Sequence, residues 1–445
     1  MRLTILFLTL VGLCFPQSGW AQRGETWVVS WAASVQGPYP VGNPSAQPDQ
    51  KFAFPQPAAG ANNQTLRLIV RPDLWGPQAR LRLSNVLGTQ PVTFDGVYVG
   101  MQLGGPAVMP GTNQPVKFAG KDSVTVQAGQ SVWSDPVALP FVRDPSEPML
   151  AGRKLAISFH VAGESGPMTW HAKALQTSYV SPPGSGSLGK SEDEAAFPYS
   201  NASWFFLDAV EMMAPSGSFA IVAFGDSITD GTASTMNGDD RWPDVLSWRL
   251  RAVHGNRIAV VNAGIGGNQI AGPPAYGADK PFPGGPSAKA RIDRDVLDLS
   301  GVSTLIWLEG INDFSKNGNA PVEKVTDGMK EIVGHIRAKR PGLRIIGATV
   351  TTALGATNAA HGFPEQDEKR KALNQFIRTS GLFDGVIDFD KATLDPATGS
   401  LKPEFVPDST VGSPGDKLHP NRAGYLAMGT AIDLDLFKTT APAPR

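Results

Sequence analysis

Between residues 22 and 217 the chain consists of short segments in which polar and apolar residues alternate. The clearest are residues 65–71, 79–84, 92–99, 123–127 and 154–161, separated by clusters of Gly, Pro and Asn. Alternation with a period of two buries one face of a strand and leaves the other face in water. The pattern therefore predicts an antiparallel, jelly-roll-like β-sandwich domain over residues 22–217.

From residue 218 onward, uninterrupted apolar runs alternate with amphipathic segments. The runs predict strands buried on both faces, at residues 219–224, 258–261, 304–308, 344–350 and 386–389. Apolar residues at helical spacing predict helices at 243–253, 321–339 and 365–379. This alternation predicts a doubly wound α/β/α domain with a parallel sheet over residues 218–445, and ligands of such sheets bind beyond the carboxyl ends of the strands.

Composition supports two soluble domains. A chain of 445 residues exceeds the usual size of one hydrophobic core, and 41% hydrophobic with 18% charged residues is typical of globular proteins. The 39 basic and 40 acidic residues nearly cancel, and no run of Lys and Arg is present. Nucleic acid and anionic membrane surfaces are therefore poor candidates for the main partner.

The first 21 residues have the features of a secretory signal peptide. Arg2 precedes an apolar segment at residues 4–14, and residues 19–21 form a small-x-small cleavage site. A membrane anchor is the alternative, but the apolar segment is well short of about 20 residues. We expect a secreted or periplasmic mature chain that begins at Gln22 and has no integral membrane segment. Its single cysteine, Cys14, lies in the signal, so no disulfide or thiolate site is expected.

Two short motifs contain the parts of a serine nucleophile and its base. Ser227 follows the predicted strand 219–224 after two residues, and His419 lies three residues after Asp416. A carboxylate at that spacing can fix the imidazole tautomer while the imidazole takes the serine proton. The alternatives are a serine that caps a helix and an exposed Asp-His pair in a loop. The other five histidines are interpreted as packing or surface residues.

Acyl transfer also requires donors for an oxyanion, and three candidates follow predicted strands. They are the backbone N–H of Ser227, the N–H of Gly267 in residues 262–267 and the side-chain amide of Asn312 in residues 310–313. Ordinary turns are the alternative for the glycines, and an amide that bonds its own backbone is the alternative for Asn312. The adjacent Gly266 is a second candidate for the glycine donor.

Together the motifs resemble the SGNH, or GDSL, hydrolase superfamily. Ser227 matches its block I, Gly267 its block II, Asn312 its block III, and Asp416 with His419 its block V Asp-x-x-His. The fuller sequences at residues 225–231, 241–243 and 418–425 are similar to the secreted XynE-like acylhydrolases. The resemblance spans roughly residues 219–437. It implies a three-layer, flavodoxin-like α/β/α domain and ester hydrolysis that needs no metal.

We therefore expect a serine ester hydrolase that cleaves short acyl esters through an acyl-Ser227 intermediate. O-acetyl groups on carbohydrate are the preferred substrate, with acylated polysaccharide as a candidate partner. The alternatives are a lipase or arylesterase and an inactive carbohydrate-binding protein. Trp242, Tyr276 and Phe314 are candidate substrate-binding residues, although Trp242 could instead pack at a helix start. No spacing of His, Asp or Glu indicates a metal, and no phosphate-binding glycine loop indicates a nucleotide cofactor.

Overall fold

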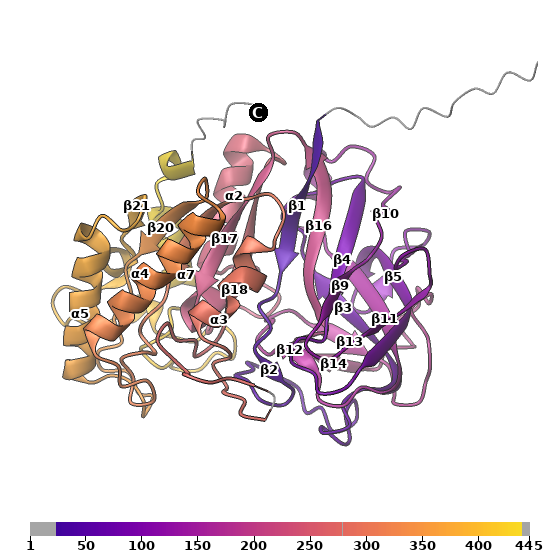
Figure 1. Ribbon diagram of the computed structural model, residues 1–445, viewed down its shortest axis with the longest axis horizontal. Coiled ribbons are helices and arrows are strands. Elements are labelled where there is room, and N and C mark those ends of the chain that lie inside the picture. Colours follow the sequence, from indigo (N-terminus) through magenta and orange to yellow (C-terminus); the bar gives the residue numbers. More distant parts are fainter. Residues whose placement is uncertain (1–23, 278, 438–445) are drawn as a thin grey trace, which may run out of the picture.

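A computed structural model of the protein describes residues 24–277 and 279–437, and the predicted signal peptide lies outside these residues. Figure 1 shows a strand-rich N-terminal half beside a C-terminal half of strands and helices. The predicted antiparallel character of the first half and the predicted parallel sheet of the second are both confirmed.

The N-terminal half forms antiparallel sheets. Its elements are β1 (Glu25–Ala32), β2 (Gly37–Pro38), β3 (Asn62–Val70), β4 (Gln78–Ser84), β5 (Val92–Gly104), β6 (Ala107–Val108), β7 (Gln114–Pro115), β8 (Ser123–Val126), β9 (Ser131–Trp133), β10 (Val137–Ala138), η1 (Pro148–Leu150), β11 (Leu155–Glu164), β12 (Thr169–His171), β13 (Ser178–Val180), β14 (Tyr199–Asn201), β15 (Trp204–Phe205) and β16 (Leu207–Pro215). Among the described residues, one sheet follows the order β1-β16-β4-β10 and another the order β14-β13-β3-β11-β5-β6. A small third sheet, β15-β12-β2, lies toward the C-terminal half and carries His171.

The C-terminal half contains a five-stranded parallel sheet with the order β18-β17-β19-β20-β21. Its elements are β17 (Phe219–Gly225), α1 (Ser227–Asp230), α2 (Trp242–His254), β18 (Ile258–Gly264), α3 (Ala288–Ile292), η2 (Asp293–Leu297), β19 (Val302–Leu308), α4 (Val322–Lys339), β20 (Arg344–Ala348), α5 (Pro364–Thr379), β21 (Gly385–Ile387), α6 (Phe389–Thr393), η3 (Pro403–Phe405), α7 (Arg422–Ala431) and η4 (Leu434–Phe437). The first strand in sequence, β17, is thus an inner strand with neighbours on both sides.

Helices cover both faces of this sheet, and the alternation of side chains along β17 shows how. Val222 and Phe224 belong to the hydrophobic cluster that includes residues of α3, α4 and α5. Ile221 and Ala223 belong to a second cluster, with residues of α2 and α7. The side chains of residues 220–224 are therefore all buried, which explains why this sequence is uninterruptedly apolar.

The two halves pack against each other along β1 and β16. The Val29 N–H donates to the Ser300 carbonyl at 2.9 Å, and the Ser300 N–H donates to the Glu211 carboxylate at 2.9 Å. One hydrophobic cluster contains residues from both halves, including Val28 and Val222. The halves therefore share a continuous core. Among the described residues, no helix is both long and apolar enough to span a membrane.

Candidate active site

Ser227 lies at the carboxyl end of the inner strand β17, where the chain turns into the short helix α1. Asp226 caps this helix, because its Oδ1 accepts the Ile228 N–H at 3.0 Å. The cap holds the turn that follows the strand. As a result, the Ser227 side chain lies where two neighbouring strands, β18 and β19, also end.

Ser227, His419 and Asp416 form one chain of hydrogen bonds. The Ser227 Oγ lies 2.8 Å from His419 Nε2, and His419 Nδ1 lies 2.6 Å from Asp416 Oδ2. The other carboxylate oxygen, Oδ1, accepts the N–H groups of Leu418 and His419, both at 2.9 Å. Because the carboxylate accepts a hydrogen bond from the Nδ1–H of His419, Nε2 carries no proton and is free to accept the proton of the serine hydroxyl.

The environment keeps Asp416 ionised. Burial by itself would raise its pKa, but the hydrogen bond and charge of His419 and the two backbone N–H groups hold the pKa of Asp416 well below its usual range. An ionised carboxylate can stabilise an imidazolium on His419. The arrangement is therefore suited to transferring a proton from Ser227 to His419.

Backbone N–H groups without acceptors lie close to this serine. Within the described residues, neither the Ser227 N–H nor the Gly267 N–H has a hydrogen-bond acceptor. The Gly266 N–H, in contrast, donates to Asp230 Oδ2 at 3.0 Å. Between the two glycines considered as donors, Gly267 is thus the one with a free N–H.

Asn312 is a further donor at the same site. One N–H of its side chain donates to the Asn268 carbonyl at 3.1 Å, which orients the amide and leaves its second N–H for another acceptor. Asn312, Gly267 and Ser227 all line one cleft of about 250 Å³. The cleft can therefore present several donors to an oxyanion formed at Ser227.

Polar side chains dominate the wall of this cleft. The residues that line it are Asn43, Lys173, Ser227, Gly266, Gly267, Asn312, Asn317, Asn358, Ala360, His361, Leu418 and His419. Asn43 and Lys173 come from the N-terminal half. The Lys173 ammonium donates to Thr232 Oγ1 at 2.6 Å, and burial lowers the pKa of Lys173. Sequence analysis found neither residue, because both reach the site from outside the motif-bearing half.

His361 is a site residue that the sequence interpretation assigned to packing or surface. Its Nδ1 accepts a hydrogen bond from Gln366 Nε2 at 2.8 Å, so its ring proton is on Nε2. Burial, with the nearby His419 as a second cause, lowers the pKa of His361 to about 4. A neutral imidazole in the cleft wall can donate to a substrate without competing with His419 as the base.

The three aromatic residues predicted as substrate-binding do not line the cleft, which corrects that prediction. Trp242 is fully buried and packs against Phe389, with ring centroids 5.1 Å apart. Phe314 belongs to the hydrophobic core. Tyr276 donates its phenol O–H to the Gln36 carbonyl of the N-terminal half. These side chains stabilise packing beside the site instead of forming its wall.

Arg291, fully buried behind the site, connects the loops that form it. Its guanidinium donates to the carbonyls of Gly225 and Ala263, at 2.8 and 2.7 Å, and to Asn268 Oδ1 at 2.7 Å. The neighbouring Glu309 accepts the Trp307 indole N–H at 2.8 Å, and burial raises the pKa of Glu309 to about 8. Among the described residues, no group of three or more His, Cys, Asp or Glu side chains is arranged to hold a metal ion.

Comparison with known families agrees with this geometry. Residues 223–427 match the family described as GDSL-like Lipase/Acylhydrolase. This part of the chain belongs to the GDSL-like lipase/acylhydrolase family. The GDSL-like domain contains all five residues that the motifs singled out, and the protein is a carboxylic ester hydrolase. A search of curated proteins finds no match to the chain.

Three of the solved structures that are similar to this chain each cover about half of it. A lipase/acylhydrolase from Enterococcus faecalis is 23% identical, covers 48% of this chain and 92% of its own, and has a TM-score of 0.36. A carbohydrate acetylesterase from Sinorhizobium meliloti is 14% identical, covers 49% and 99%, and has a TM-score of 0.35. An aryl esterase from M. smegmatis is 16% identical, covers 48% and 96%, and has a TM-score of 0.36.

Proposed function

We propose that the protein is an exported serine esterase that removes short acyl groups, with O-acetyl groups on carbohydrate as its preferred substrates. The observation that carries the proposal is the hydrogen-bonded chain from Ser227 Oγ through His419 to Asp416, with distances of 2.8 and 2.6 Å. In it, Ser227 is the nucleophile, His419 the general base and acid, and Asp416 the residue that orients His419.

The first half of the proposed reaction acylates the enzyme. Ser227 Oγ attacks the ester carbonyl while His419 Nε2 takes its proton, and the carbonyl oxygen becomes an oxyanion bound by Ser227, Gly267 and Asn312. Collapse of this intermediate breaks the ester bond. His419 then returns the proton to the leaving alcohol, which departs and leaves an acyl-Ser227 ester.

The second half releases the acid. Water enters beside His419, which removes one proton as the water oxygen attacks the acyl carbonyl. The same three donors bind the second oxyanion, and His419 protonates Ser227 Oγ as the acid leaves. Donors held in place before the reaction stabilise both oxyanions without reorganising, and each donor typically contributes about a hundredfold to a thousandfold in turnover.

The size and polarity of the cleft support the short-chain, carbohydrate-directed proposal. Its volume of about 250 Å³ lies below the roughly 300–1,000 Å³ typical of pockets for drug-sized ligands. Its wall includes Asn317, Asn358 and His361, whose amide and imidazole groups can bond sugar hydroxyls. A long acyl chain would instead require a continuous apolar wall.

A series of p-nitrophenyl esters from acetate to palmitate, measured together with acetyl release from acetylated xylan, tests the substrate proposal. We expect kcat/KM to be highest with p-nitrophenyl acetate. We also expect the protein to release acetate from acetylated xylan. A maximum at palmitate would favour a lipase. Rapid hydrolysis of p-nitrophenyl acetate without acetyl release from acetylated xylan would favour an arylesterase.

A fluorophosphonate probe tests the catalytic proposal. We expect it to label the natural protein at Ser227, and we expect Ser227→Ala and His419→Ala to lose turnover completely. A natural protein that is neither labelled nor active on p-nitrophenyl acetate would favour an inactive carbohydrate-binding protein. Export is tested separately, by N-terminal sequencing of the protein recovered from the periplasm or medium, where we expect Gln22 as the first residue.

A further inference from the structure

The N-terminal half holds the carbonyl side of the peptide group that carries the candidate oxyanion donor. The Gly266 carbonyl and the Gly267 N–H belong to one peptide group, and in a trans peptide they point in opposite directions. Asn43 Nδ2 donates to this carbonyl at 2.8 Å. The Gly267 N–H has no acceptor among the described residues and is left to face the cleft that Gly267 lines.

We infer that Asn43 is a positioning residue for the oxyanion hole: its hydrogen bond to the Gly266 carbonyl fixes the direction in which the Gly267 N–H points. This inference rests on the proposed role of Gly267 in catalysis. It gives the strand-rich half a part in turnover beyond packing. The half without the catalytic motifs would then set how well the other half stabilises an oxyanion.

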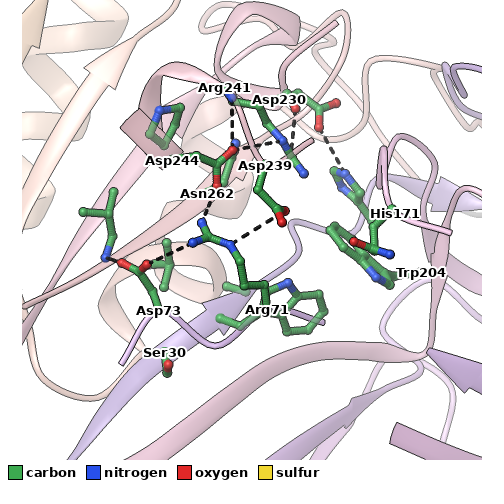
Figure 2. A pocket seen from close by; sticks show the side chains of 16 residues that line it. Ser30, Arg71, Asp73, His171, Trp204, Asp230, Asp239, Arg241, Asp244 and Asn262 are labelled. Atoms are coloured by element: carbon green, nitrogen blue, oxygen red, sulfur yellow. Dashed lines mark hydrogen bonds and ion pairs between the residues drawn. The ribbon is translucent and has the colours of Figure 1, made fainter. Parts of the chain in front are cut away.

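The preceding peptide group is held through a second contact from the N-terminal half. The Gly266 N–H donates to Asp230 Oδ2 at 3.0 Å, and Asp230 Oδ1 lies 3.1 Å from His171 Nε2. Figure 2 shows His171 directed at Asp230 beside a cluster of Arg and Asp side chains between the two halves. His171 Nδ1 faces the Ser34 carbonyl at 2.7 Å, so both ring nitrogens face acceptors and the imidazolium form satisfies them.

The two glycines provide the space for these contacts. A Cβ atom on Gly266 would lie 3.2 Å from Lys173 Nζ and 3.4 Å from Asn43 Cβ. A Cβ on Gly267 would lie 3.0 Å from Asn43 Nδ2. The φ of Gly267 is +84°, a value that residues with a side chain rarely adopt. The N-terminal half therefore lies directly on this peptide, and a larger residue would press on Asn43 or Lys173.

A pair of glycines also makes external support necessary. Glycine adopts many backbone conformations at low cost, so the Gly266–Gly267 peptide group could rotate and turn its carbonyl toward the cleft. A carbonyl in that position would repel the oxyanion, and the N–H donor would be lost. Since loss of one donor costs about a hundredfold to a thousandfold in turnover, partial loss of its orientation should cost about tenfold to a hundredfold.

The test compares Asn43→Ala with Gln36→Leu. Both side chains donate to the Pro283 carbonyl across the halves, Asn43 at 3.2 Å and Gln36 at 2.8 Å, but only Asn43 bonds the Gly266 carbonyl. On p-nitrophenyl acetate we expect Asn43→Ala to lower kcat about tenfold to a hundredfold with KM within about twofold. Gln36→Leu should keep kcat within about threefold of the natural value. The rate of fluorophosphonate labelling, whose phosphoryl oxygen occupies the oxyanion hole, should fall in parallel with kcat.

Full kcat in Asn43→Ala, or an equal loss in Gln36→Leu, would overturn the inference. If Asn43→Ala fails to fold, Asn43→Asp replaces it, because a carboxylate of the same shape cannot donate to the Gly266 carbonyl; natural kcat in that variant would overturn the inference equally. Ser227→Ala separates the two proposals. If it is inactive while Asn43→Ala is fully active, only the positioning role fails, whereas an active Ser227→Ala would contradict the proposed function itself.

Discussion

Asp416→Asn is the substitution that tests the proposed triad most sharply, because the two oxygens of Asp416 have different tasks. Oδ1 holds the turn by accepting two backbone N–H groups, and Oδ2 accepts from His419 Nδ1. Asparagine can keep its oxygen on the two N–H groups. Its NH₂ then faces His419 Nδ1, which must become an acceptor.

The expected loss of turnover follows from the tautomer of His419. When Nδ1 accepts, the ring proton moves to Nε2, and Nε2 can no longer take the proton of Ser227 Oγ 2.8 Å away. In serine triads this error lowers kcat by about 10⁴, equivalent to about 5 kcal/mol of activation free energy. The fold should change little, since the backbone N–H groups keep an acceptor.

Asp416→Ala separates the effect of Asp416 on the orientation of His419 from its effect on stability. It removes both tasks, so we expect low kcat together with a fall of about 2–4 kcal/mol in the free energy of unfolding, from two hydrogen bonds to a charged group. Asp408→Asn is the matched control: Asp408 Oδ1 also accepts two following N–H groups, those of Thr410 and Val411, but no imidazole. We expect Asp408→Asn to keep kcat within about twofold.

The assay is steady-state hydrolysis of p-nitrophenyl acetate by the three variants, with urea unfolding of each. The reasoning would be refuted if Asp416→Asn retained more than about a tenth of the natural kcat, because an imidazole with the wrong tautomer could not be that active. It would also be refuted if Asp416→Asn were as unstable as Asp416→Ala, since the turn would then depend on the charge and not on the acceptor.

Three further substitutions test the surroundings of the triad. Asn312→Ala should lower kcat about a hundredfold to a thousandfold in steady-state kinetics, and unchanged kcat would remove Asn312 from the oxyanion hole. Trp242→Ala should lower the free energy of unfolding in urea by about 3–5 kcal/mol without raising KM. A raised KM at unchanged stability would instead indicate that Trp242 contacts the substrate. Burial raises the pKa of Glu309 to about 8, from an ordinary 4.5. Between these values the folded state binds a proton that the unfolded state has lost, so stability falls as pH rises. Glu309→Gln should reduce the fall in unfolding free energy by about 1.4 kcal/mol per pH unit between about pH 5 and 7.5. Equal slopes of unfolding free energy against pH in the variant and the natural protein would contradict the raised pKa of Glu309.

Much of the C-terminal half could be predicted because its strands are buried on both faces. The apolar run 304–308 lies in β19 (Val302–Leu308), and the amphipathic segment 243–253 lies in α2 (Trp242–His254). The errors occur at strand ends. The run 344–350 continues past β20, which ends at Ala348, because side chains take over the backbone groups of Val350: its N–H donates to Asn374 Oδ1 at 2.7 Å.

In the N-terminal half, alternation identified strands such as β4, but the expected wet face was wrong there: Arg82 and Ser84 are buried, and Arg82 pairs with Asp208 at 2.6 Å. The predicted strand 79–84 lies in β4 (Gln78–Ser84). In β16 (Leu207–Pro215), the first six residues are all buried, because one face packs in the N-terminal core and the other lies toward the C-terminal half. Its two charged residues, Asp208 and Glu211, lie three positions apart, so the sequence of this strand does not alternate with a period of two.

The candidate catalytic motifs could be found from the sequence because the chemistry proposed for the serine, its base and the oxyanion donors restricts the residue types at those positions. Asn43 and His171 are not restricted in that way. An asparagine in a Pro- and Gly-rich loop and a histidine after a tryptophan have common structural interpretations, and their partners lie 223 and 59 residues away.

The one sequence feature that reflects these contacts is Gly266. A strand-ending turn that needs a positive φ explains Gly267, but Gly266 has no such φ in the structure. Lys173 and Asn43 of the other half approach Gly266 closely: a Cβ atom there would lie 3.2 Å from Lys173 Nζ and 3.4 Å from Asn43 Cβ. The glycine without a positive φ thus lies where another part of the chain packs closely onto the backbone.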